Sequence, residues 1–154
     1  MNLRLPVDTY SPDQLSGLVL ELQDLAAAAR DRAARREDTQ FDLSPNLAAL
    51  LAENNVADND VPAIETLTKG ATTLIDTTPS VHILLAAMPG RAIKRQIVTW
   101  FRTNISPRAL LTFAVRSDLG GGAIVQAGSH LYDLSFRRGI IDNKARITEI
   151  AGVR

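Results

Sequence analysis

The residues of this chain that could take part in chemistry are few and widely spaced. There are no cysteines, which excludes disulfides, thiolate metal sites and thiol nucleophiles. The two histidines, His82 and His130, stand 48 residues apart and have no acidic pair at metal-ligand spacing beside them. His82 lies in an apolar run, which favours a hydrogen-bonded histidine in the core or at a sheet edge over a metal ligand.

Residues 120–122, all glycine, are the one cluster that could suggest phosphate binding. The Lys-Ser/Thr pair of a P-loop is missing, and a strand-like segment follows where a P-loop has a helix. No G-x-S-x-G motif of a serine nucleophile is present. The acidic pair Glu37-Asp38 lies in a polar segment typical of solvated turns. We therefore expect no catalytic centre, no metal and no cofactor.

Composition and charge place the chain among soluble proteins of one domain or two small ones. Its 154 residues are 45% hydrophobic and 22% charged. No apolar run approaches the ~20 residues of a membrane span, and the first ten residues have no leader pattern. We expect a cytoplasmic bacterial protein. Residues 1–80 hold six Lys/Arg against 13 Asp/Glu, whereas residues 81–154 hold 11 against four. This asymmetry indicates either two modules with different partners or two halves that attract each other.

The first half of the chain predicts a small helical bundle over residues 1–78. One helix begins with Ser11 as N-cap, Pro12 in the first turn and Gln14 completing a capping box, and it runs to about residue 36. A second helix opens with Ser44-Pro45 and a third follows Asp60. Apolar residues recur at spacings of three and four along all three helices. The bundle is the first module of the α+β protein that we expect.

The second half, residues 79–154, predicts a small mixed β-sheet domain flanked by helices. Residues 81–87 and 109–115 are strand-like, and residues 90–104 between them are helical, which suggests a right-handed parallel crossover. Residues 122–127 and 130–132 read as a hairpin, with Gly128 first in a type II′ turn. Ser135 is expected to cap a last helix that carries Ile140, Ile141, Ile147 and Ile150.

The helix at residues 90–104 carries a basic face. We expect Trp100 and Phe101 on its core side and four cations opposite them, namely Arg91, Lys94, Arg95 and Arg102. Other basic residues that could extend this face are Arg108, Arg116, Arg137 and Arg138. Partner docking is the favoured interpretation, beside simple solvation. Nucleic-acid binding would require exposed aromatic residues and a net basic protein, whereas aromatics are 5% of the chain and the net charge is zero.

The order of elements in residues 115–140 resembles the C-terminal signature of the delta subunit of F-type ATP synthase, the family of the mitochondrial oligomycin-sensitivity-conferring protein. The matching features are an apolar strand, a glycine corner, a second apolar strand, a glycine turn and an Asp-x-Ser motif. The residues that carry them are Gly121, Gly122, Gly128, Asp133 and Ser135. Glycines permit the tight corner, and Asp and Ser can bond free amides at a helix start.

The resemblance implies a non-catalytic subunit of the peripheral stalk, on the cytoplasmic face of the bacterial plasma membrane. Its bundle would bind the N-terminal peptide of the ATP synthase alpha subunits, and its C-terminal domain would bind subunit b. A groove for the alpha peptide is expected at Leu15, Leu18, Leu22, Ile64 and Leu67. Contacts to subunit b are expected at Arg91, Lys94, Arg95, Arg102, Arg137 and Arg138.

The length of the first half leaves other interpretations open. This half is shorter than the six-helix bundle typical of the family. The alternative is a free-standing adaptor or regulatory module that shares the C-terminal fold. A small enzyme is a third interpretation that no constellation of residues supports.

Overall fold

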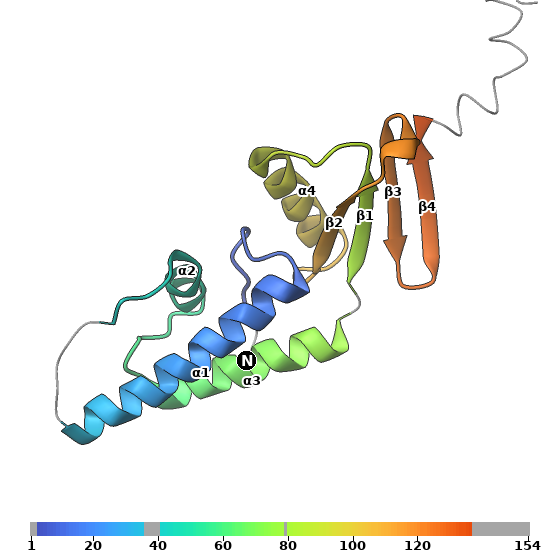
Figure 1. The fold of residues 1–154 in the computed structure, drawn as a ribbon. Coiled ribbons are helices and arrows are strands. Elements are labelled where there is room, and N and C mark those ends of the chain that lie inside the picture. The colour runs from blue at the N-terminus through green and yellow to red at the C-terminus, as the bar shows by residue number, and fades with distance from the viewer. Residues whose placement is uncertain (1–2, 36–40, 79, 137–154) are drawn as a thin grey trace, which may run out of the picture.

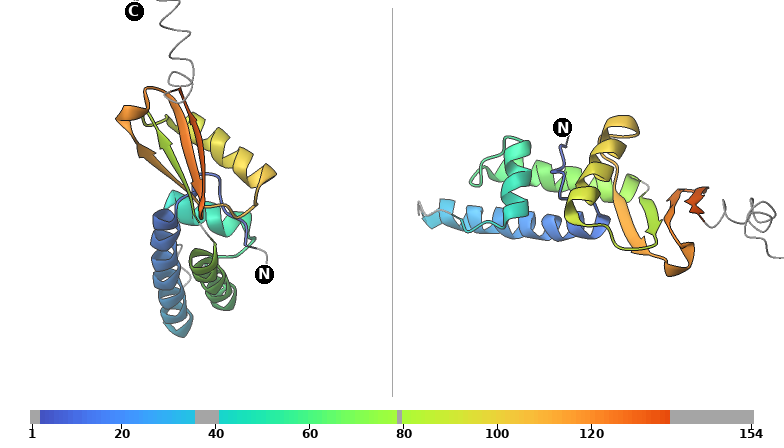
Figure 2. Two further views of the ribbon diagram at one scale, coloured as in Figure 1. Left: turned by 90° about the vertical axis from the view of Figure 1, so that its right-hand side faces the viewer. Right: turned by 90° about the horizontal axis from the view of Figure 1, so that it is seen from above.

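The chain folds into helices followed by a small mixed sheet, which confirms the expected α+β class (Figure 1). The computed structural model describes residues 3–35, 41–78 and 80–136. Its helices are α1 (Pro12–Arg35), α2 (Pro45–Glu53), α3 (Val61–Thr77) and α4 (Arg91–Asn104), with a 3₁₀ turn η1 (Ser117–Leu119). Its strands are β1 (Val81–Leu85), β2 (Leu111–Val115), β3 (Gly122–Ala127) and β4 (His130–Ser135). Helices α1, α2 and α3 form one end of the molecule and the sheet with α4 the other (Figure 2).

Local capping defines where the first three helices begin. Ser11 and Gln14 form the expected capping box: the Ser11 Oγ accepts the Gln14 amide at 3.2 Å, and the Gln14 Oε1 accepts the Ser11 amide at 3.1 Å. The Ser44 Oγ accepts the Leu47 amide at 3.2 Å, and the Asp60 Oδ1 accepts the Ala63 amide at 3.1 Å. Each cap is followed by a proline in the first turn, where no amide hydrogen is needed.

The helical core forms where the apolar stripes of α1 and α3 meet, with α2 packed on the same cluster. Leu15, Leu22 and Ile64 have no exposed surface at all. Two members of this cluster come from outside the bundle: Leu3 precedes α1, and Leu110 immediately precedes β2. The helical core therefore extends to the base of the sheet, and the two halves of the chain share packing.

The sheet has the strand order β2-β1-β3-β4, and the second core lies between this sheet and α4. Strands β1 and β2 are parallel, as the strand-helix-strand pattern predicts, whereas β3 is antiparallel to both β1 and β4. Val98 of α4 is completely buried against Val81, Ile83 and Leu111. Helix α4 therefore covers the middle of one sheet face.

Helix α4 exposes apolar side chains that the sequence predicts to be in the core. The sequence of the helix at residues 90–104 predicts Ile93, Trp100 and Phe101 on one core-facing side, but the side chains of Ile93 and Trp100 are 53% and 55% exposed. Only Val98, Ile97 and Phe101 pack on the sheet. The prediction for Ile93 and Trp100 is wrong because a single helix over a narrow sheet buries only part of its apolar stripe.

The hairpin forms as expected, but its second strand is longer. Gly128 has φ +58°, and no non-glycine residue of the turn has positive φ, as a type II′ turn requires of its first position. Strand β4 continues through Ser135, because the ladder reaches the first residue of β3 with Gly122 paired to Ser135. Asp133 and Ser135 thus lie in a strand, and the Asp133 Oδ1 accepts the Ser135 amide there at 2.9 Å. The last helix, with Ile140, Ile141, Ile147 and Ile150, falls outside the described residues.

The glycine corner before β3 is required by geometry. Gly120, Gly121 and Gly122 have φ values of +65°, +145° and +77°. A Cβ on Gly122 would lie 2.3 Å from the carbonyl oxygen of Leu134, and one on Gly121 would lie 2.5 Å from the Phe136 ring. A Cβ on Gly120 would meet nothing within 4 Å. At Gly122, therefore, the backbones of β3 and β4 approach too closely for any side chain.

We predict that Gly122→Ala lowers the free energy of unfolding by roughly 3 kcal/mol, because backbone strain and a clash with the β4 backbone add together. Gly120→Ala is the matched control, and it should cost only about 1 kcal/mol, the strain of its positive φ alone. Urea denaturation of the full chain measures both. Equal losses for the two variants would contradict the close approach of the strands at Gly122.

Candidate functional site

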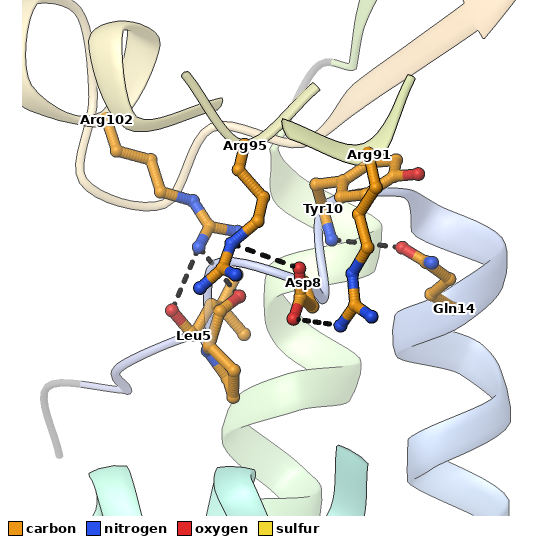
Figure 3. Close-up of polar contacts among 8 residues, drawn as sticks. Leu5, Asp8, Tyr10, Gln14, Arg91, Arg95 and Arg102 are labelled. Carbon is orange, nitrogen blue, oxygen red and sulfur yellow. Dashed lines mark hydrogen bonds and ion pairs between the residues drawn. The ribbon is translucent and has the colours of Figure 1, made fainter. Parts of the chain in front are cut away.

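The N-terminal segment, residues 3–10, connects the two cores (Figure 3). Leu3 is buried in the helical core, whereas Val7 and Tyr10 pack against the sheet core. Near its start, the Arg4 amide donates to the Asn54 Oδ1 at 2.9 Å, and the Asn54 Nδ2 donates to the Arg4 carbonyl at 2.8 Å. The segment is thus fixed at the end of α2 before it reaches the sheet.

Arg102 of α4 holds the middle of this segment through backbone carbonyls (Figure 3). Its Nη1 donates to the carbonyls of Leu5 and Pro6, both at 2.9 Å, and its Nη2 donates to the Thr9 carbonyl at 2.6 Å. Burial lowers the pKa of the Arg102 guanidinium, which nevertheless stays charged at physiological pH. One side chain thereby satisfies three carbonyls that lie outside any helix or strand.

Asp8 adds an ion-pair contact beside Arg102. Its Oδ2 accepts from the Arg91 Nη2 at 2.7 Å, and its Oδ1 lies 3.5 Å from the Arg95 Nε. The hydrogen bond from Arg91 lowers the pKa of Asp8, against a smaller opposing effect of burial. The same contact raises the pKa of Arg91. Both arginines are at least half exposed, so this pair orients the segment more than it stabilises the fold.

Tyr10 extends the sheet at its first edge. Its carbonyl accepts the Leu111 amide at 2.7 Å, on the side of β2 that faces away from β1. Its ring meets Phe113 edge-on, with centroids 5.6 Å apart. The N-terminal segment therefore pairs with the edge of β2 at Leu111, the first residue of that strand.

The basic residues expected to bind subunit b make different contacts from one another. Arg91, Arg95 and Arg102 all contact the N-terminal segment, and Arg102 is directed inward. The Lys94 Nζ lies 5.8 Å above the centre of the Phe113 ring, a cation–π contact. Arg137 and Arg138 lie outside the described residues. The four cations of α4 therefore do not form one free docking face, and Trp100 is exposed on the other side of the helix.

The residues expected to line a groove for the alpha peptide are core residues. Leu15, Leu18, Leu22, Ile64 and Leu67 are only 0–3% exposed, because α1 and α3 pack their apolar stripes directly on each other. A shallower groove of about 480 Å³ lies on the outer side of this helix pair. It contains the Arg30–Glu65 ion pair, and its lining residues are Gln23, Ala26, Arg30, Glu65, Thr68, Lys69, Thr72 and Thr73.

Sequence reasoning missed Asp8, Thr9 and Tyr10, the residues that receive the contacts of α4 and β2. Asp8 is separated from Arg91 by 83 residues, and Thr9 from Arg102 by 93. No local periodicity connects such positions. The available signal is an acidic residue in the N-terminal segment and a strongly basic helix in the other half of the chain, which predicts only a general attraction between the halves.

Within the described residues, no three His, Cys, Asp or Glu side chains gather as metal ligands. Across the same part of the chain, no helix has the length and apolarity needed to cross a membrane. Neither a protein-family model nor a curated protein matches this chain.

We predict that Arg102→Met lowers the free energy of unfolding by about 2–4 kcal/mol, because three carbonyls lose a charged donor at once. Arg91→Met removes the same charge from the same helix but breaks only an exposed ion pair, so it should change stability little. Thermal and urea unfolding of both variants test this. A similar loss for both would mean that net charge, and not the carbonyl contacts, stabilises the segment.

The Asp8 contact predicts a pH dependence. Because the pKa of Asp8 is lower in the folded chain than in the unfolded chain, its contribution is present at neutral pH and is lost as pH falls through the folded pKa. The difference in unfolding free energy between wild type and Asp8→Asn should therefore be constant above about pH 5 and should shrink as pH falls through the pKa of Asp8 in the folded chain. A difference that persists at low pH would show that the negative charge of the Asp8 carboxylate is not the source of the stabilisation.

Proposed function

We propose that this chain is the delta subunit of an F-type ATP synthase, a non-catalytic part of the peripheral stalk on the cytoplasmic face of the bacterial plasma membrane. The observation that carries the proposal is the glycine corner at residues 120–122. It joins a parallel strand-helix-strand unit to an antiparallel hairpin. This order of elements along the chain is the feature by which the sequence resembles that family. In this role the protein prevents the catalytic head from turning with the rotor while proton flow drives rotation.

The connection between the two cores supports a mechanical role. A stalk component must transmit force between a partner on one module and a partner on the other. Here Leu3 and Leu110 pack in the helical core, and the N-terminal segment contacts α2, α4 and β2. The two modules are therefore held by packing and hydrogen bonds as well as by the chain between α3 and β1.

The partners that we propose are the alpha-subunit N-terminal peptide for the helical module and subunit b for the sheet module. Since the four leucines and one isoleucine of the expected groove are buried, the peptide would have to bind the outer groove between α1 and α3. The residues that line this outer groove include Ala26, Thr68 and Thr72. On the sheet module, Lys94 is the basic residue of α4 that has no contact to the N-terminal segment among those described.

The test is affinity capture of the tagged full chain from mildly solubilised membranes of the source cell, followed by mass spectrometry. We expect the alpha, beta and b subunits together. Thr72→Glu in the outer groove should weaken capture of alpha roughly tenfold or more, because an unpaired carboxylate would be buried in the interface. Capture of b by this variant should be unchanged.

Thr66→Glu is the matched control, since Thr66 and Thr72 are both exposed on α3 and both donate to the carbonyl four residues earlier. Thr66 lies outside the groove lining. Equal loss of alpha in both variants would place the peptide elsewhere. Capture of other proteins without ATP synthase subunits would overturn the proposal and favour the free-standing adaptor.

A further inference from the structure

The outer face of α4 carries an exposed stripe without charge. It consists of Gln96, Thr99, Trp100 and Thr103, all of them exposed. Their spacings of three and four place them on one side of the helix, over a length of about 10 Å. A helix face that meets only solvent usually carries charged side chains, whereas the centre of a protein interface is poor in charge and rich in tryptophan. The composition of this stripe is therefore that of an interface.

A shallow groove of about 450 Å³ follows the stripe, and Arg95 is among its lining residues. Five positions separate Arg95 from Trp100, which puts their side chains about 140° apart around the helix axis. Thr99 and Thr103 lie between them and are shorter, so they form the floor. The groove thus has one aromatic wall and one cationic wall.

Asp8 of the N-terminal segment occupies the cationic wall (Figure 3). Its Oδ1 lies 3.5 Å from the Arg95 Nε, and its Oδ2 accepts from the Arg91 Nη2 at 2.7 Å. The side chains of Arg95 and Arg91 remain 52% and 78% exposed, and such exposed ion pairs contribute at most about 1 kcal/mol.

The rest of the segment does not depend on Asp8. Arg102 donates to three of its carbonyls, and Leu3 is buried in the helical core. The Asp8 carboxylate can therefore leave the two arginines while the segment stays in place.

We propose that α4 docks an acidic amphipathic helix, and that Asp8 competes with the carboxylates of this partner for Arg91 and Arg95. Charge complementarity selects the partner, because α4 carries four Lys/Arg and no Asp or Glu. Asp8 shows which group fits, since the planar guanidinium matches a carboxylate. An apolar side chain of the partner packs on Trp100 while its carboxylate replaces Asp8 at Arg95. The N-terminal segment thereby lowers the affinity of α4 for its partner.

This inference rests on the proposed function for the identity of the partner, which would be subunit b, and adds the regulation of that contact by Asp8. The two fail separately when the docking is tested with a synthetic peptide. Capture of the chain without ATP synthase subunits would overturn the proposed function and leave the peptide result standing. Absence of peptide binding would overturn this inference and leave the capture result standing.

Trp100 reports on the groove directly, because it is the one tryptophan of the chain. The probe is a tryptophan-free helical peptide with Leu along one face and Glu beside it, and the control peptide has Gln in place of every Glu. In a titration of the full chain, the Glu peptide should shift Trp100 emission to the blue and saturate, and the Gln peptide should bind at least fivefold more weakly. Arg95→Gln should weaken the Glu peptide roughly three- to fivefold. Equal binding of the two peptides would overturn the proposal.

Asp8→Asn tests the competition. It should tighten binding of the Glu peptide roughly three- to fivefold, because the peptide no longer displaces a carboxylate from Arg95 and Arg91. Asp24→Asn is the matched control: it removes the same charge, and Asp24 is exposed on α1 without an ion pair among the described residues. Far-UV circular dichroism checks that both variants keep the fold. Equal tightening in both would mean that net charge alone acts, which contradicts the competition.

Three further outcomes would assign the groove to another occupant and overturn the proposal. Trp100 of the free chain already protected from acrylamide, at a monomeric mass, would show that the chain fills its own groove. A doubled mass with concentration-dependent protection of Trp100 would assign the groove to a second copy. Tighter binding of an oligothymidylate than of the Glu peptide would assign it to nucleic acid, with bases stacked on Trp100.

Discussion

The contact between the Arg102 guanidinium and the carbonyls of Leu5, Pro6 and Thr9 is the interaction on which the arrangement of this chain depends. The N-terminal segment has no regular structure of its own, so its backbone acceptors must find donors elsewhere. The Arg102 guanidinium donates to three of them, at the cost of partial burial that lowers its own pKa. With the segment fixed in this way, Leu3 can enter one core while Val7 and Tyr10 enter the other.

One contact within the fold uses the difference in charge between the acidic and the basic half of the chain. The contact of Asp8 with Arg91 and Arg95 brings one acid of the first half against two cations of the second. The sequence allows either attraction between the halves or separate partners, and this contact shows attraction between the halves. The remaining acidic and basic residues still give each module its own surface charge. That charge is available for partners of opposite sign.

The features that sequence reasoning predicted correctly are those that neighbouring residues determine. Ser11 with Gln14, Ser44 with Pro45 and Asp60 with Pro62 begin helices through contacts within four residues. Gly128 likewise determines the type of the hairpin turn, because its φ is positive. The errors concern distant partners: the length of β4 depends on pairing with Gly122, and the exposure of Trp100 depends on how much of the sheet α4 covers. The contacts of Arg102 cross more than 90 residues and leave no local pattern.

The buried leucines of α1 show why a core stripe and a binding groove cannot be told apart in a short bundle. With many helices, some apolar surface remains for a partner after the core is complete. Here α1 and α3 bury Leu15, Leu22 and Ile64 completely against each other, so opening them to a peptide would sacrifice the helical core. A partner helix can therefore bind only on outer surfaces, such as the groove lined by Ala26, Thr68 and Thr72. Binding there would rely on contact from several modules of the assembly at once, which suits a protein whose two cores are held in a fixed relation.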